Sequence, residues 1–208
     1  KLVISLALSL AMFLPALAEV QYLSFAKGIS AETAEFKVAK TVTETLSYID
    51  VTYTFEGATL STSAMGVNLG MDNAYYLSEK GNPSLPFYSD MFVIPNLTIS
   101  EIEVLDVAYQ DFEGVDIAPS VGNTSVSSSD DAKPFERSDV YQNNAFFPNS
   151  TVSIVEKKIY QGAPLVNVNI YPVCFNPVKQ TVRCYSTITY RLHIDGNDMT
   201  TIKSSTLD

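Results

Sequence analysis

A strict two-residue alternation in the last third of the chain constrains its fold most strongly. Apolar residues occupy every second position from Val166 to Cys174, and the pattern resumes from Val182 to Ile194 after the turn-like stretch Asn176-Pro-Val-Lys-Gln. Side chains of a β-strand point alternately to its two faces, so each run predicts a strand with one buried face. The turn between them predicts that the two strands form a hairpin.

The alternation also predicts a register for this hairpin. If Cys174 lies opposite Cys184, every inward residue of one strand meets an inward residue of the other, and a slip of one position breaks all of these pairs. The further pairs are Ile170 with Ile188, Val168 with Tyr190, and Val166 with Leu192. Cys174 and Cys184 are the chain's only cysteines. They are interpreted either as a cross-strand disulfide or as two buried thiols.

Other segments carry the same type of pattern. Residues Tyr48 to Phe55 alternate, a short strand is expected near Ala58–Ser63, and another over Met91–Ile94. Residues 97–109 are rich in β-branched side chains, and their change of parity predicts a bulge or turn near Leu105. We therefore expect an all-β fold, a single antiparallel β-sandwich of two sheets with a jelly-roll-like arrangement.

The first 18 residues are expected to be a signal peptide. Lys1 precedes an apolar run that ends at Ala16-Leu-Ala, which is typical of a secretory signal with a small-residue cleavage site. The mature chain then begins at Glu19. This predicts export to the periplasm, the cell surface or the medium, and no membrane segment after signal removal. Residues 19–44 are expected to form an N-terminal strand or connector, residues 45–195 the sandwich, and residues 196–208 a flexible tail.

The charge balance argues against nucleic-acid binding. The chain has 13 Lys and Arg against 23 Asp and Glu, a net charge of −10, whereas binding a phosphate backbone requires clustered basic residues. We expect no cofactor and no metal, because the single histidine and the two cysteines do not supply a closed four-ligand site. His193 falls on the opposite strand face from both cysteines, so we expect no catalytic residues in this segment.

A set of short motifs gives the chain a family resemblance. Gly81-Asn-Pro-Ser-Leu-Pro-Phe-Tyr leads to Phe92-Val-Ile-Pro, and the segments Ile117-Ala-Pro-Ser-Val-Gly, Phe146-Phe-Pro and Tyr171-Pro-Val-Cys follow in order. Over residues 45–195 this order resembles the N-terminal propeptide of gingipain-like cysteine peptidases, peptidase family C25. The resemblance implies a β-sandwich prodomain that assists folding, keeps the peptidase latent as an inhibitor, and is removed by proteolysis. The implied partner is the cognate cysteine peptidase catalytic domain, in cis or in trans.

The resemblance also suggests site residues. In gingipains an exposed prodomain loop places a basic side chain in the acidic specificity pocket of the catalytic domain. The matching region lies between Val121 and Tyr141, a Ser-, Asp- and Gly-rich stretch whose basic residues are Lys133 and Arg137. We expect Lys133 first, and Arg137 second, to fill the pocket. Lys203 is a candidate processing site.

Two questions stay open at this point. The 208 residues contain none of the family's Cys–His catalytic block, so the chain is expected to be either a fragment of a longer peptidase or a free-standing domain. The resemblance implies that the full-length parent is a C25 cysteine endopeptidase. The alternative function is an exported β-sandwich module for adhesion or carbohydrate binding, without a peptidase partner.

Overall fold

The computed structural model describes residues 21–26, 36–94, 99–122, 136–160 and 162–194. Strands β1 to β12 and one 3-10 helix make up the regular structure of these residues, and no α-helix occurs among them. Every pairing between named strands is antiparallel. The predicted all-β class is therefore confirmed. The predicted signal peptide, residues 1–18, lies outside the described residues.

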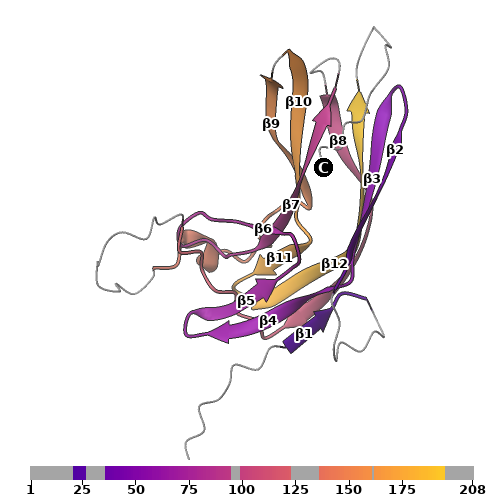
Figure 1. The fold of residues 1–208 in the computed structure, drawn as a ribbon. Helices are drawn as coiled ribbons and strands as arrows, with labels where there is room; N and C mark the ends of the chain where they lie inside the picture. Colours follow the sequence, from indigo (N-terminus) through magenta and orange to yellow (C-terminus); the bar gives the residue numbers. More distant parts are fainter. Residues whose placement is uncertain (1–20, 27–35, 95–98, 123–135, 161, 195–208) are drawn as a thin grey trace, which may run out of the picture.

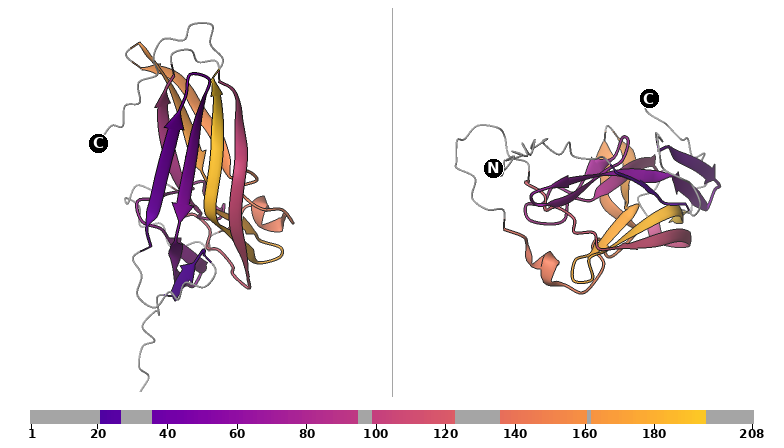
Figure 2. Two further views of the ribbon diagram at one scale, coloured as in Figure 1. Left: turned by 90° about the vertical axis from the view of Figure 1, so that its right-hand side faces the viewer. Right: turned by 90° about the horizontal axis from the view of Figure 1, so that it is seen from below.

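Two larger sheets face each other, with β2, β3 and β12 on one side of Figure 1 and β7, β9 and β10 on the other. The five-stranded sheet consists of β11 (Val173–Asn176), β12 (Thr181–Ile194), β3 (Tyr48–Phe55) and β2 (Val38–Glu44), with β8 (Ile99–Glu113) paired to β12. The four-stranded sheet has the order β6 (Tyr75–Tyr76), β7 (Pro86–Val93), β10 (Ala163–Ile170) and β9 (Val152–Tyr160). Figure 2 shows the strands of the first sheet side by side.

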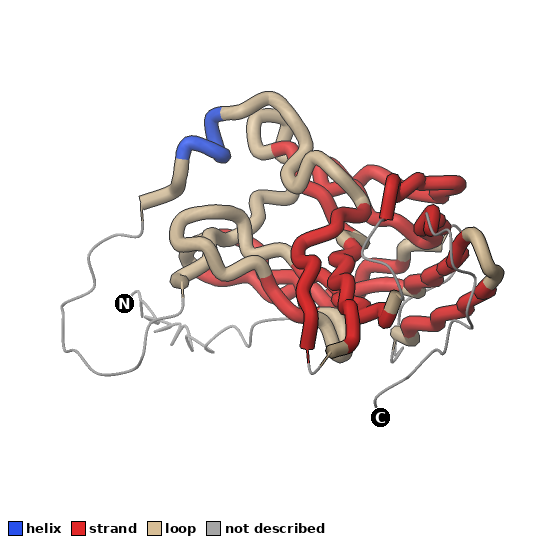
Figure 3. Tube along the Cα trace, turned by 90° about the horizontal axis from the view of Figure 1, so that it is seen from above, coloured by secondary structure: helices blue, strands red, loops and turns tan. Residues whose placement is uncertain are grey.

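A third, smaller sheet lies at the lower end of the other two in Figure 1. It consists of β1 (Gln21–Ser24), β4 (Gly57–Ser63) and β5 (Gly66–Gly70). The 3-10 helix η1 (Asp139–Gln142) lies at one side of the molecule, as the view from above shows (Figure 3). The prediction of only two sheets therefore missed this third layer.

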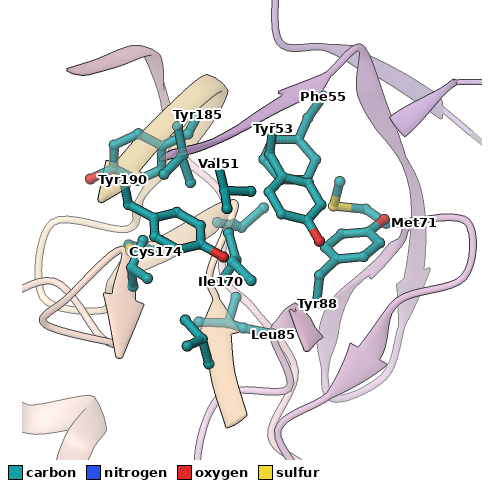
Figure 4. Packing of buried hydrophobic residues seen from close by; sticks show 14 of the residues in the cluster. Val51, Tyr53, Phe55, Met71, Leu85, Tyr88, Ile170, Cys174, Tyr185 and Tyr190 are labelled. Carbon is teal, nitrogen blue, oxygen red and sulfur yellow. The ribbon is translucent and has the colours of Figure 1, made fainter. Parts of the chain in front are cut away.

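The core lies between the inner faces of the two larger sheets. Val51 and Tyr53 of β3 and Tyr190 of β12 meet Tyr88 of β7 and Ile170 of β10, all of them buried (Figure 4). The rings of Tyr53 and Tyr88 lie 6.1 Å apart between centroids. Aromatic rings remove a large apolar area from water, so this packing between opposite sheets stabilises the fold.

One buried carboxylate links the two sheets. Asp90 of β7 accepts hydrogen bonds from the hydroxyls of Tyr53 (2.8 Å) and Tyr190 (3.0 Å) and forms a 2.6 Å ion pair with Lys40 of β2. Burial, together with the neighbouring Asp90 charge, raises the pKa of both tyrosines, which keeps them protonated as donors. A buried charge is tolerated only with such partners. Among the described residues, no buried side-chain polar atom lacks a hydrogen-bond partner.

The predicted C-terminal hairpin is correct in place and wrong in register and extent. Cys174 lies opposite Arg183, and Cys184 lies opposite Val173, so the ladder is shifted by one residue. The residues of β10 do not pair with β12: Ile170 lies opposite Tyr88 of β7 in the other sheet. Pro172, which has no N–H for a ladder, marks the point where the chain crosses between sheets. Both sheets bury their inner faces in one core, so the alternation alone does not distinguish them.

The other predicted strands are found in the structure. Ile49, Val51, Tyr53 and Phe55 are all buried on β3, as their alternation predicts. The predicted short strand at 58–63 is β4, and the run at 91–94 is the end of β7, which begins at Pro86. Residues 99–113 form one strand, and its register against β12 shifts between Val104 and Asp106, which confirms the predicted bulge at Leu105.

Candidate functional site

Three irregular segments meet beside β6, where the described chain comes to the two ends of residues 123–135 (Figure 1). We call residues 79–84, 116–122 and 136–141 together the loop anchor. The first two segments are joined by backbone hydrogen bonds. Gly81 N–H donates to the Ser120 carbonyl (3.0 Å), Ser120 N–H to the Asn82 carbonyl (2.7 Å), and Ser84 N–H to the Ala118 carbonyl (3.0 Å). This short ladder fixes the chain that leads into residues 123–135.

The third segment binds to the same two residues. Ser138 N–H donates to the Gly81 carbonyl (3.0 Å), and the Ser138 hydroxyl donates to Oδ1 of Asn82 (2.6 Å). The other side of the Asn82 amide donates to Oε2 of Glu79 (2.8 Å). Asn82 is only 6% exposed. It therefore connects the outgoing and returning parts of the chain in a nearly dry environment, where each hydrogen bond is more costly to lose.

Gly81 shows why this place requires glycine. Its φ is +85°, and a Cβ atom there would lie 2.9 Å from the carbonyl oxygen of Glu136 and 3.1 Å from the amide nitrogen of Ser138. Both contacts are with backbone, which cannot rotate away as a side chain does. Pro83 and Pro86 fix the φ angles that follow, and thus the direction in which the chain leaves for β7.

Arg137 completes the anchor with a group of charged and aromatic side chains. Its guanidinium donates to Oδ1 and Oδ2 of Asp116 (3.0 and 2.7 Å) and to the carbonyl of Met65 (3.0 Å), and it lies 4.5 Å from the ring centroid of Tyr141. The Tyr141 hydroxyl donates to the Ile117 carbonyl (2.8 Å). The bond to Asp116 raises the pKa of Arg137, and burial raises the pKa of Tyr141 to about 12. Both side chains therefore keep their protons and their donor roles at neutral pH.

The two chain ends that flank residues 123–135 come together at this anchor. On one side, Gly122 N–H donates to the Ser120 hydroxyl (3.1 Å), and the position of a Gly122 Cβ would be 3.3 Å from Cβ of Lys80. On the other side, Glu136 lies against Gly81. The arrangement brings the described residues on either side of 123–135 to the same segment of the chain, Lys80–Gly81. Within the described residues, no group of three or more His, Cys, Asp or Glu side chains is placed to hold a metal ion.

Comparison with known proteins identifies the family. The Propeptide_C25 family matches residues 39–207, which is most of the chain. The chain belongs to the C25 propeptide family. This agrees with the resemblance that its proline motifs suggested.

Relatives of this C25 propeptide are gingipains. Gingipain R2 of Porphyromonas gingivalis is 28% identical over 182 residues, which cover 86% of this chain and 24% of the relative. Gingipain R1 of Porphyromonas gingivalis is 31% identical over 113 residues, which cover 54% of this chain and 11% of the relative. The chain thus spans about a quarter or less of the length of these relatives.

Two solved structures share the fold of this C25 propeptide. One is described as the complex of Porphyromonas gingivalis RgpB pro- and mature domains, with a TM-score of 0.67, 24% identity, and coverage of 80% of this chain and 90% of that chain. The other concerns the zymogenic latency of gingipain K from Porphyromonas gingivalis, with a TM-score of 0.67, 16% identity, and coverage of 86% and 100%.

The predicted site residues of the C25 propeptide fall in different places. Arg137 lies in the loop anchor, bound to Asp116. Lys133 and Lys203 lie outside the described residues. His193 is on the outer side of β12, 2.9 Å from Glu103. The sequence patterns had predicted no contacts for Asn82, Asp116 or Tyr141, because their partners are not neighbours in sequence.

The two cysteines are buried free thiols in the structure. The observed register gives them opposite faces of the β11–β12 hairpin, because Cys174 shares a face with Arg183 and Cys184 shares one with Val173. The register on which the disulfide prediction rested is therefore wrong. Burial raises the pKa of Cys174 to about 12 and that of Cys184 well above the usual thiol value. Neither thiol is suited to act as a nucleophile at neutral pH.

No helix among the described residues is both long and apolar enough to cross a membrane.

Proposed function

We propose that this C25 propeptide keeps a gingipain-like cysteine peptidase latent and assists its folding until proteolysis removes the propeptide. The proposal is supported by the family membership and by relatives of which this chain corresponds to about a quarter. The fold neighbours are described as a complex of pro- and mature domains and as a structure bearing on zymogenic latency. The family match favours this function over an adhesion or carbohydrate-binding module.

The single structural observation that carries the proposal is the loop anchor. A segment that inhibits a peptidase must enter the active site without losing its shape, and fixing both of its ends lowers the entropy that it loses on binding. Here Gly122 and Glu136 are held against the Lys80–Gly81 segment. Residues 123–135 therefore start and end on a prepared base, which is what a latency loop requires.

Within this loop we propose Lys133 as the residue that enters an acidic specificity pocket. A lysine ammonium can pair with a buried carboxylate there, and such a pair stays stable only when both charges are matched. Arg137 is less suited to this role, because Asp116 already occupies its guanidinium with two hydrogen bonds. Lys203 remains our candidate for the processing site at which the propeptide is released.

We further propose that residues 1–18 are a signal peptide, which would place the propeptide and its peptidase in the periplasm, at the cell surface or in the medium. The apolar run and its Ala-Leu-Ala end support this assignment. N-terminal sequencing of the exported protein tests it, and a mature start far from Glu19 would contradict it.

The proposed function is tested by adding the separately produced propeptide to its mature peptidase and measuring the inhibition constant with a peptide substrate. Lys133→Ala should weaken inhibition by between roughly 100-fold and several thousand-fold, because leaving a buried pocket carboxylate unpaired costs about 3–5 kcal/mol. Lys158→Ala is the control, since Lys158 lies on β9 in a surface pair with Glu156. Equal potency of the Lys133 and Lys158 variants would contradict the assignment of Lys133, and no inhibition by the parent chain would contradict the latency function.

A further inference from the structure

The described residues contain three groups of the same composition. In each one an arginine binds both carboxylate oxygens of an aspartate and lies over a tyrosine ring. The anchor trio is Arg137, Asp116 and Tyr141; the two sheet trios are Arg183, Asp111 and Tyr109, and Arg191, Asp50 and Tyr48. The distances from guanidinium carbon to ring centroid are similar, at 4.5, 4.1 and 3.9 Å. Similar local chemistry therefore occurs in three different backbone settings.

The backbone setting separates the anchor trio from the other two. Arg183 lies directly opposite Asp111 in the β12–β8 ladder, and Arg191 directly opposite Asp50 in the β12–β3 ladder. Strand hydrogen bonds already hold those partners in place. Asp116 and Arg137 are on no common ladder, and the chain between them includes residues 123–135. Their ion pair therefore joins the outgoing and returning sides of the loop through side chains.

We propose that Arg137, Asp116 and Asn82 are positioning residues of the inhibitor, which set its potency by fixing both ends of residues 123–135. This inference rests on the proposed latency function. Asn82 is bonded to the segment that follows residues 123–135 through Ser138, and Asp116 is bonded to it through Arg137. Each connection involves a different pair of side chains, so the base is held at two separate points.

The physical basis is the entropy of the loop. When one side-chain link is lost, the chain ends sample more positions, and ordering them again opposes binding to the peptidase. The folded body needs these links much less, because β-ladders and the buried core hold it together. We therefore expect potency and thermal stability to respond differently to changes in the anchor.

Arg137 cannot serve as anchor and pocket residue at the same time. In its present place it donates to both Asp116 oxygens and to the Met65 carbonyl. To enter a pocket, it would give up all three hydrogen bonds and its contact with Tyr141. The geometry therefore assigns it to the base of the loop.

The test compares Arg137→Lys with Arg183→Lys, a matched control from a sheet trio. Each change keeps the charge and removes the two-pronged guanidinium geometry. The measured quantities are the inhibition constant against the mature peptidase and the melting temperature. Arg137→Lys should raise the inhibition constant by about tenfold, whereas Arg183→Lys should leave it unchanged at a similar loss of melting temperature. Ser138→Ala, which removes only the side-chain bond to Asn82, should act in the same direction as Arg137→Lys by a smaller factor.

A second background shows whether the effect passes through the loop. In this background residues 123–135 are replaced by a Gly-Ser linker of equal length, and Arg137→Lys should no longer change the remaining inhibition. An equal effect of Arg137→Lys and Arg183→Lys, or an effect that persists in the linker background, would overturn the positioning role. If the linker chain inhibits as well as the parent, insertion of the loop as proposed above is itself wrong, and that result is distinct from the other two.

Discussion

The outer face of the five-stranded sheet and the loop anchor contain the same kinds of side chains, but these have different structural roles in the two regions. On the sheet, Arg183 with Asp111 and Arg191 with Asp50 bridge strands that the backbone has already paired. In the anchor, Arg137 with Asp116 joins segments that share no strand ladder. The same kind of ion pair is therefore added to an existing strand pairing in one region, whereas in the other region it helps to determine the backbone geometry. How much a pair of side chains matters depends on what else holds its backbone.

The two regions also differ in redundancy. Around the sheet trios, the Thr52 and Thr189 hydroxyls bond to one another at 3.1 Å, and β8 and β12 are paired over most of their length. In the anchor, the returning segment is held to Gly81 and Asn82 through the backbone and side chain of Ser138. A single substitution should therefore change the backbone geometry little on the sheet and more in the anchor.

Glycine-to-alanine substitutions should give the largest difference in stability and inhibition between the two regions. Gly81 and Gly114 both have positive φ, +85° and +74°, but a Cβ at Gly81 would meet the Glu136 carbonyl at 2.9 Å, whereas one at Gly114, after β8, would have nothing within 4 Å. Gly114→Ala should lower the free energy of unfolding by about 1 kcal/mol through backbone strain alone. Gly81→Ala should cost about 2–4 kcal/mol and weaken inhibition, because the backbone of the returning segment must shift.

Denaturant titration and inhibition assays on both glycine variants check this expectation. If Gly114→Ala weakened inhibition as much as Gly81→Ala, general destabilisation rather than anchor geometry would account for the loss.

Loss of a single hydroxyl gives the next smaller effect. Tyr141→Phe removes the 2.8 Å bond to the Ile117 carbonyl and keeps the ring beside Arg137. It should lower the free energy of unfolding by about 1 kcal/mol, because the carbonyl of the buried residue Ile117 loses this hydrogen-bond donor. Tyr109→Phe is the matched control, since the Tyr109 hydroxyl makes no side-chain hydrogen bond within the described residues. Equal unfolding midpoints for the two variants in urea would show that the Tyr141 hydroxyl contributes nothing.

The sequence predicted the strands better than their partners. Alternation identifies a strand and its buried face, as at Ile49 to Phe55, because burial acts on each strand separately. It does not identify the sheet, since β10 and β12 bury their residues in the same core from opposite sides. The change of sheet at Pro172 was therefore missed, and with it the register of the cysteines.

The loop anchor was predicted only in part. The Gly81–Pro86 motif was identified as part of the family resemblance, and its glycine and prolines act on the local backbone. Its partners were not predicted. Asp116 and Arg137 are 21 positions apart, and Asn82 and Ser138 are 56 apart, in segments without periodicity. Such contacts follow from the tertiary fold, which local patterns do not encode.

The acid dependence of stability should reveal the sheet trios. The hydrogen bond from Arg183 holds the pKa of Asp111 below its ordinary value of 3.8. A lowered carboxyl pKa stabilises the folded state above the unfolded pKa, and this stabilisation is lost as the pH falls through the folded pKa. Asp111→Asn should therefore be less stable than the parent at neutral pH, by no more than about 1 kcal/mol because the pair is partly exposed.

The difference between Asp111→Asn and the parent should shrink as the pH falls below the ordinary carboxyl range and vanish below the folded pKa. Melting temperatures of the two chains between neutral pH and strong acid measure it. A constant difference across the whole range would mean that the substitution acts through packing and not through the charge of Asp111.

The rate of cysteine alkylation should show the smallest difference between substitutions in a sheet trio and in the loop anchor. Cys174 lies opposite Arg183, whose guanidinium also lies 4.3 Å from the ring centroid of Phe146, so this sheet trio covers one side of the buried thiol. A native-state alkylation assay should give very slow labelling of the parent, a rate a few-fold higher for Arg183→Ala, and no change for Arg137→Ala. Denatured protein without reductant should yield two reactive thiols, whereas a disulfide would yield none. Equal acceleration by both arginine variants would mean that labelling reports global unfolding, and the sheet trio would then have no local covering role.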